Sequence, residues 1–173
     1  LDRQRFNPSV VTLHPGHGDY WEAPIEALDI PLYRIPQRLN RIRRLLEIIK
    51  ILQKHQPDLI HGWHTFASPY AGLCAKFLKT KSLGGIRSSF PAVAHSKEAK
   101  LTHLFCDAII ANSYTTAQAY QVSLRRHGQR VYTVQNGLET NFFSREVARA
   151  YFVANYGVPK DAIWVATIGR MHP

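Results

Sequence analysis

The 173-residue sequence lacks several features that would place it in a class at once. No uninterrupted apolar run exceeds five residues, so we expect no membrane-spanning helix. The first residues are charged and no apolar stretch follows them, which argues against a signal peptide. An initiator Met is also absent, and we expect the true start to lie upstream. The only cysteines, Cys74 and Cys106, have apolar neighbours, which is typical of buried thiols in a reducing compartment.

Signature motifs of several enzyme classes are missing as well. The chain has no Gly-x-Gly-x-x-Gly and no Walker lysine loop, and therefore no complete nucleotide-binding fingerprint. It has no Gly-x-Ser-x-Gly elbow and no cysteine–histidine hydrolase signature. These absences leave a ligand-binding protein whose chemistry must be sought in shorter motifs.

Positive charge is abundant, with 22 Lys and Arg against 12 Asp and Glu and a net charge of +10. Such an excess indicates an anionic partner. Arg34, Arg38 and Arg41 follow one another at helical spacing and can form one cationic stripe. A solvated helix face and docking on anionic lipid headgroups both explain this stripe. Nucleic acid is disfavoured as a partner, because no binding motif accompanies the charge.

Short β-branched runs alternate with amphipathic stretches, which predicts an α/β fold with a mainly parallel sheet flanked by helices. Strands are expected at residues 9–13, 30–34, 58–61, 83–87, 108–111, 131–134 and 163–168. Helices are expected at residues 24–28, 38–56, 66–79, 96–105, 145–156 and from 112 or 113 to about 127. The last strand follows a helix and a turn, as though a new domain were beginning. We therefore expect one domain at residues 1–157 and the start of a second at residues 158–173.

Ligands of open α/β sheets gather at the carboxyl ends of the strands. The first polar strand end is the segment from His61 to His64, which includes Trp63. Its imidazoles suit a substrate hydroxyl, general-base catalysis or a purely structural role. A zinc site would need further ligands, and no motif supplies them, so we expect no metal.

The second polar strand end is Arg87-Ser88, whose cation and hydroxyl suit a phosphate or a sugar. A structural ion pair of Arg87 with a carboxylate is the alternative. Just before it, Gly84 and Gly85 suggest that a helix or a ligand approaches the backbone closely.

Two further polar pairs follow later strands. Asn112 and Ser113 are candidate substrate contacts, although both are also ordinary helix caps. Asn136 and Gly137 are candidates too, although the pair is typical of a turn.

Six short segments in this order resemble glycosyltransferase family 4. The residues that carry the resemblance are 57–64, 70–73, 85–88, 109–113, 134–137 with Phe143, and 168–173. The resemblance implies a GT-B enzyme, with two Rossmann-like domains facing across a cleft. The first domain would receive the acceptor and the second would hold a nucleotide-sugar donor, with retaining transfer and without a metal or other cofactor. Gly169 and Arg170 would contact the donor phosphates.

The chain also departs from the family pattern. The family's first strand and glycine-rich loop should precede Ser9. Where close relatives often have histidine after the Ile-Arg motif, this chain has Ser88, so the catalytic residue is open and His64 is a candidate. Glu139 stands where an aspartate is more common. The donor-binding domain is mostly absent.

Together these observations predict an acceptor-side fragment of a glycosyltransferase that uses a lipid- or glycan-linked acceptor. The fragment itself should be inactive. We expect a cytoplasmic protein that can attach to the inner membrane face. Two alternatives remain: a non-catalytic module for phosphorylated ligands or membrane surfaces, and a degenerate homologue that acts as an interaction protein.

Overall fold

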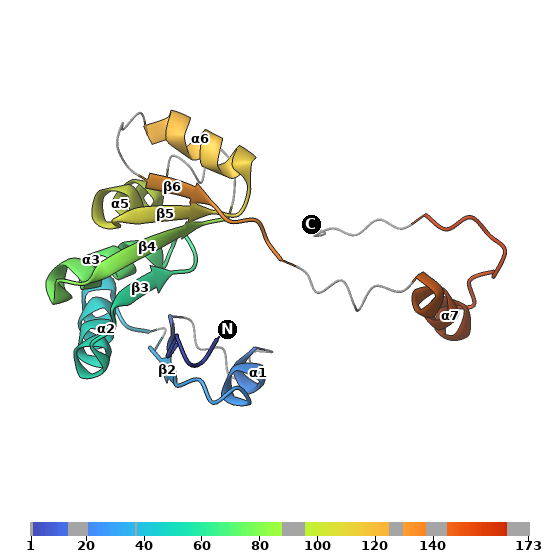
Figure 1. Cartoon of the computed structure of the whole chain (residues 1–173), viewed down its shortest axis with the longest axis horizontal. Coiled ribbons are helices and arrows are strands. Elements are labelled where there is room, and N and C mark those ends of the chain that lie inside the picture. Colours follow the sequence, from blue (N-terminus) through green and yellow to red (C-terminus); the bar gives the residue numbers. More distant parts are fainter. Residues whose placement is uncertain are drawn as a thin grey trace. The chain divides into compact units, whose positions relative to one another are not determined.

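The computed structural model of the chain describes residues 2–13, 21–36, 38–87, 96–124, 130–137 and 145–165. The chain divides into two compact units, Leu1–Asn136 and Gly137–Pro173, and each is considered by itself. All the strands that are described belong to the first unit (Figure 1).

The described strands of the first unit form two parallel sheets. In the smaller sheet β1 (Val10–Thr12) pairs with β2 (Leu32–Arg34). The larger sheet has four parallel strands in the order β3-β4-β5-β6 (Figure 1). These strands are β3 (Leu59–Gly62), β4 (Lys81–Ile86), β5 (Ala108–Ala111) and β6 (Arg130–Thr133).

Helices occupy the connections between the strands. They are α1 (Glu22–Glu26), α2 (Arg41–His55), α3 (Ser68–Leu78), α5 (Lys97–Phe105) and α6 (Tyr114–Leu124). The helices α3, α5 and α6 each connect two neighbouring parallel strands of the larger sheet, as in repeated βαβ units. The predicted fold class is confirmed: a mainly parallel, Rossmann-like sheet flanked by helices.

The helix α2 begins and ends at residues whose backbones leave the helical region. Asn40 is extended, and its side-chain oxygen accepts the Arg43 N–H at 2.9 Å, so the helix starts at Arg41 and not at the predicted residue 38. At the other end Gln56 adopts a left-handed conformation with φ of 46°, just before Pro57.

The apolar side chains of α2 are only partly directed at the core. Ile48, Ile49 and Leu52 are buried, whereas Ile42 is 72% exposed and Leu46 is 51% exposed. The outer face of α2 therefore combines apolar and basic side chains.

The predicted stripe of Arg34, Arg38 and Arg41 along one helix is wrong. Arg34 ends β2, and its guanidinium lies 2.9 Å from Glu22 and 2.8 Å from Glu26. Hydrogen bonds to these two carboxylates raise the pKa of Arg34. Arg38 precedes the helix, and only Arg41 belongs to it, because the Asn40 cap sets the helix start.

Two apolar clusters stabilise the first unit. One combines Ile35, Ile48, Ile49, Leu52 and Cys74, and the other combines Ile86, Ala99, Ile109 and Tyr120. Cys74 and Cys106 are free, buried thiols, as predicted, and burial is the main cause that raises the pKa of each to about 12. Both thiols therefore stay protonated at neutral pH.

The second unit contains α7 (Arg145–Tyr156), whose predicted bounds are confirmed and which is followed by Gly157 with φ of 63°. The predicted strand at residues 163–168 is not confirmed in its described part, residues 163–165, which are irregular, and Ile163 is 95% exposed. A strand needs a neighbour for its backbone hydrogen bonds, and none is described in this unit. Residues 166–168 lie outside the described residues.

Along the chain, the boundary between the two compact units falls between Asn136 and Gly137. The predicted domain boundary at residues 157 and 158 stays a prediction. Within the described part of the chain, no helix has the length and apolarity needed to cross a membrane.

Candidate functional site

Three side chains gather where β3 and β4 end. Trp63 follows β3 directly, and its ring centroid lies 5.0 Å from that of His61. The guanidinium carbon of Arg87, which follows β4, lies 4.6 Å from the Trp63 ring centroid. Because β3 and β4 are parallel neighbours, their carboxyl ends bring these residues to one edge of the sheet. This arrangement, here called the Trp63 cluster, confirms that the two predicted strand ends lie together.

The first turn of α3 holds these two strand ends in place through Ser68. This serine is fully buried, and its hydroxyl contacts Gly62 O at 3.1 Å, His64 O at 2.9 Å and Gly85 O at 3.4 Å. The Gly85 N–H in turn donates to Ser68 Oγ at 3.0 Å. One side chain thus joins the ends of β3 and β4 to the start of α3.

Glycines allow the backbones to approach one another at this point. A Cβ on Gly85 would lie 2.7 Å from the Gly62 carbonyl oxygen and 2.8 Å from that of Trp63. A Cβ on Gly84 would lie 2.5 Å from the Thr102 methyl group of α5. The paired glycines therefore accommodate helix α5 and the neighbouring backbone of β3. Of the two explanations that the sequence left open, a helix or a ligand near the backbone, the structure supports the helix.

The environment of His61 favours its neutral form. Burial of the imidazole lowers its pKa below the usual value of 6.5, and the positive charge of Arg87 lowers it further. His61 nevertheless keeps an exposed surface. A neutral imidazole at neutral pH can accept a proton or a hydrogen bond.

His64 lies in the loop between β3 and α3 and is exposed. Its Nδ1 accepts the Phe66 N–H at 3.3 Å, so the other ring nitrogen points away from this bond and carries the proton in the neutral form. The catalytic role of His64 stays a prediction.

The end of β5 adds a third polar pair. Ser113 caps α6, since its hydroxyl accepts the Thr116 N–H at 3.1 Å. Asn112 is bonded to β4 through its backbone, with its N–H 3.3 Å from Ile86 O. Its buried Oδ1 accepts no hydrogen bond from the described residues. Of the two cap candidates, Ser113 is therefore the capping residue.

Comparison with known proteins assigns the chain to a family. The model of "Glycosyltransferase Family 4" matches residues 1–142. The chain belongs to glycosyltransferase family 4. No curated protein sequence shows significant similarity to it.

Solved structures of HepE from Anabaena share the fold of this family 4 chain. The complex with UDP and glucose has a TM-score of 0.66 at 15% identity, over 86% of this chain and 42% of HepE. The complex with UDP-glucose has a TM-score of 0.67 at 15% identity, over 86% of this chain and 41% of HepE. The chain thus spans about two fifths of the length of these relatives.

The other predicted site residues of the family 4 chain lie outside the Trp63 cluster or outside the described residues. Asn136 and Gly137 are exposed and irregular, and the boundary between the two compact units falls between them in the sequence. Ser88, Gly169 and Arg170 lie outside the described residues. Among the residues that the structure describes, no three His, Cys, Asp or Glu side chains group as metal ligands.

Sequence reasoning missed two residues that shape the site. A serine in the first turn of a helix is typical of a helix cap. The sequence around Ser68 therefore does not indicate that this residue links two strands. Arg44 is the second missed residue: it is 7% exposed and donates to Tyr70 Oη at 3.3 Å and to Leu39 O at 3.2 Å. Its guanidinium also lies 5.5 Å from the Phe66 ring centroid, beside the loop that carries His64.

The link between Arg87 and His61 is open to direct measurement. Arg87→Met should raise the pKa of His61, because a nearby positive charge that opposes protonation is removed. The pKa should stay below 6.5, since burial is the larger cause. An NMR titration of the His61 ring measures this change, with Arg34→Met as the control that leaves it unchanged. A His61 pKa that does not rise in Arg87→Met would contradict the arrangement.

Proposed function

We propose that this chain is the acceptor-side part of a glycosyltransferase that transfers a sugar from a nucleotide donor to a glycan- or lipid-linked acceptor. Membership of family 4 supports the reaction class. HepE, whose fold the chain shares, is solved with UDP and with UDP-glucose, which favours a nucleotide-sugar donor. The stacking of Arg87 on Trp63 beside His61 is the observation in this chain that carries the proposal.

The Trp63 cluster offers what an acceptor sugar or its phosphate needs. Trp63 is 62% exposed, so it can present apolar surface to a sugar ring. Arg87 can donate paired hydrogen bonds to phosphate oxygens or sugar hydroxyls. His61, held neutral, and His64 can accept the proton of the acceptor hydroxyl that is transferred. Of the two, we propose His64, on the exposed loop, as the general base. Its Nδ1 would have to release the Phe66 N–H to take this proton, since the other ring nitrogen already carries one in the neutral form.

The donor side completes the proposal. Gly169 and Arg170 would contact the donor diphosphate, and Asn112, Asn136 and Gly137 would border the acceptor. Transfer would retain the anomeric configuration and would need no resident metal ion. Because the donor-binding part is mostly outside these residues, the isolated chain would show no transferase activity.

Truncation of Trp63 tests the acceptor site in the full-length enzyme. Trp63→Ala should lower kcat/KM for the acceptor by roughly 10- to 100-fold, which corresponds to the loss of about 1–3 kcal/mol of contact energy. The KM for the nucleotide-sugar should stay unchanged, since the donor binds elsewhere. Trp21→Ala is the matched control, because Trp21 is similarly exposed at 65% and lies outside the Trp63 cluster.

The result separates the proposal from its alternatives. Equal acceptor kinetics in Trp63→Ala and Trp21→Ala would remove the Trp63 cluster from the acceptor site. A full-length protein that binds no nucleotide-sugar and transfers none would instead be a degenerate homologue that acts as an interaction protein.

We also propose that the protein attaches to the cytoplasmic face of an anionic membrane through the outer faces of α2 and α5. A groove of about 230 Å³ lies between α2, α3 and α5, and Ile42, Leu45, Leu73 and Leu101 contribute to its lining. At the rim of this groove Arg41 forms an ion pair with Glu98 at 3.9 Å. Further exposed basic residues lie on or beside the same two helices: Arg38, Arg43, Lys97 and Lys100. Apolar side chains among basic ones are typical of a helix that lies in the membrane interface. Arg34, bound to Glu22 and Glu26, is not part of this surface.

Vesicle binding of the full-length protein tests the attachment. Ile42→Glu should lower partition onto vesicles that contain phosphatidylglycerol by roughly tenfold or more, because an inserted apolar side chain contributes about 1.5–3 kcal/mol. Charge reversal of Arg38 and Arg41 should lower it as well. Leu28→Glu is the control, since Leu28 is 65% exposed in the turn that follows α1. If the Ile42 and arginine variants bind like the unmodified protein, the outer face of α2 is merely solvated.

A further inference from the structure

The groove between α2, α3 and α5 opens at the edge of the larger sheet where the Trp63 cluster lies. Each of these helices leads within a few residues into the start of a strand, β3, β4 or β5. The helices therefore begin at the opposite edge, where the strands end. The groove is lined by the first two turns of all three helices and by the loop before α3. It is here called the α3 groove.

The α3 groove is apolar inside and charged at its rim. Leu45 of α2, Leu73 of α3 and Leu101 of α5 contribute to its lining, and the charged lining residues are Arg41 and Glu98. Its volume is about 230 Å³, whereas an apolar cavity of about 150 Å³ is large enough to hold benzene. The α3 groove therefore has room for a hydrocarbon segment of roughly eight carbon atoms.

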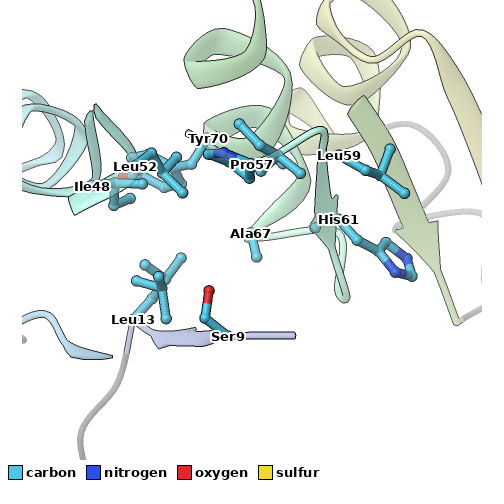
Figure 2. A pocket seen from close by; sticks show the side chains of 13 residues that line it. Ser9, Leu13, Ile48, Leu52, Pro57, Leu59, His61, Ala67 and Tyr70 are labelled. Carbon is cyan, nitrogen blue, oxygen red and sulfur yellow. The ribbon is translucent and has the colours of Figure 1, made fainter. Parts of the chain in front are cut away.

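Arg44 fixes the end of the α3 groove that lies next to the loop between β3 and α3. Its buried guanidinium donates to Tyr70 Oη at 3.3 Å, and the guanidinium carbon lies 5.5 Å from the Phe66 ring centroid. The centroids of these two rings are 5.9 Å apart, and both residues line the groove. Tyr70 also lines a second pocket, shown in Figure 2 with Ile48 and Leu52 of α2. Held by Arg44, Tyr70 forms a common wall of the two cavities.

The same end of the α3 groove reaches the proposed acceptor site. The Phe66 N–H donates to His64 Nδ1 at 3.3 Å, so a lining residue of the groove contacts the proposed general base. A chain that lies in the groove would therefore leave its head group at the loop that carries His64. This continuity allows one acceptor molecule to occupy both the groove and the acceptor site.

Positive charge surrounds the α3 groove. The exposed basic residues on or beside the first turns of α2 and α5 are Arg38, Arg41, Arg43, Lys97 and Lys100. The lining carboxylate of Glu98 lies 3.9 Å from Arg41, which offsets its negative charge. The excess of positive charge favours a phosphate beside the apolar interior. It disfavours a second copy of this chain as the occupant, because the same cations would then face one another.

We propose that the α3 groove binds the hydrocarbon chain of a phosphate-linked lipid acceptor, with the phosphate at the basic rim and the acceptor hydroxyl at the His64 loop. This inference rests on the proposed function, which leaves a glycan-linked or a lipid-linked acceptor open, and it selects the lipid. It differs from attachment to the membrane surface, because the chain of one acceptor molecule occupies the groove. A helix of a partner protein fits less well, since about four of its side chains would have to enter a space for roughly eight carbon atoms.

Binding of alkyl phosphates to the full-length protein, measured by calorimetry without vesicles or micelles, tests the chain site. Octyl phosphate should bind at least about 100-fold more tightly than ethyl phosphate, because its additional methylene groups leave water. Leu101→Glu should weaken the binding of octyl phosphate by roughly tenfold or more. Leu104→Glu is the matched control, since Leu104 is also exposed on α5 but lies outside the lining of the groove. Equal affinity for the two phosphates, or equal effects of the two substitutions, would overturn the proposal.

Two further probes separate the acceptor chain from other ligands. Dihexanoylphosphatidylglycerol has two chains and should bind at least about tenfold more weakly than octyl phosphate, because the groove has room for roughly eight carbon atoms. Octyl glucoside has the chain without a charge and should bind at least about fivefold more weakly, because the basic rim attracts phosphate. A phospholipid that binds as tightly as octyl phosphate would make the groove a site for bilayer lipid. Equally tight binding of octyl glucoside would exclude a phosphate site at the rim, and either result contradicts the proposal.

Binding of UDP, measured on the same samples, reports on the proposed function separately. A protein that binds octyl phosphate through Leu101 but binds no UDP would support the groove site and contradict the glycosyltransferase. A protein that binds UDP but does not distinguish octyl from ethyl phosphate would support the nucleotide-sugar donor and refute the groove site. A dimer that dissociates in Leu101→Glu but not in Leu104→Glu would also refute it, because a second copy would then fill the groove.

Discussion

The close approach of β3, β4 and the first turn of α3 is the constraint on which the candidate site depends. Ser68 joins the two strand ends by hydrogen bonds, and the backbone at Gly85 packs on the carbonyl groups of Gly62 and Trp63. Backbone groups at this separation leave no room for a Cβ, so the position is rigid for steric as well as polar reasons. The packed backbone around Gly62, Ser68 and Gly85 is here called the joint. Trp63 follows Gly62 directly, so its side chain has a defined position although it is more than half exposed.

The remaining features of the site follow from this joint. Parallel pairing of β3 with β4 brings Arg87 to the same edge as Trp63, where the guanidinium stacks on the indole. The same cation, together with burial, keeps His61 neutral. Helix α3, held at its start by Ser68, also packs beside α2, where Arg44 contacts Tyr70. A single packed junction thus connects the substrate-facing side chains to the core of the unit.

Much of the fold could be predicted because its signals are local. Ser96 and Pro57 mark helix ends locally, because the Ser96 hydroxyl accepts the Ala99 N–H and proline disfavours the helical conformation of the residue before it. The β-branched runs mark strands. The errors arise where distant contacts decide the outcome. Arg34 fits a helical spacing, but the Asn40 cap starts the helix later and two glutamates of α1 bind the arginine. Residues 163–165 have the composition of a strand but lack a described neighbour. In the site, the proximity of the two strand ends was predictable from parallel topology. The contacts of Ser68 and Arg44 were not predictable, because they join elements that are distant in the sequence: Ser68 joins α3 to β3 and β4, and Arg44 joins α2 to α3.

The stability of Gly85→Ala, measured by urea unfolding, tests this account most directly. The new Cβ would overlap two backbone carbonyl oxygens that cannot move without separating β3 from β4. We predict a loss of about 2–3 kcal/mol in the free energy of unfolding, in the range of overpacked cores. Gly137→Ala serves as the reference, because nothing lies within 4 Å of its added Cβ, and it should change stability by less than about 0.5 kcal/mol. Equal stability of the two variants would contradict the claim that this joint positions the site.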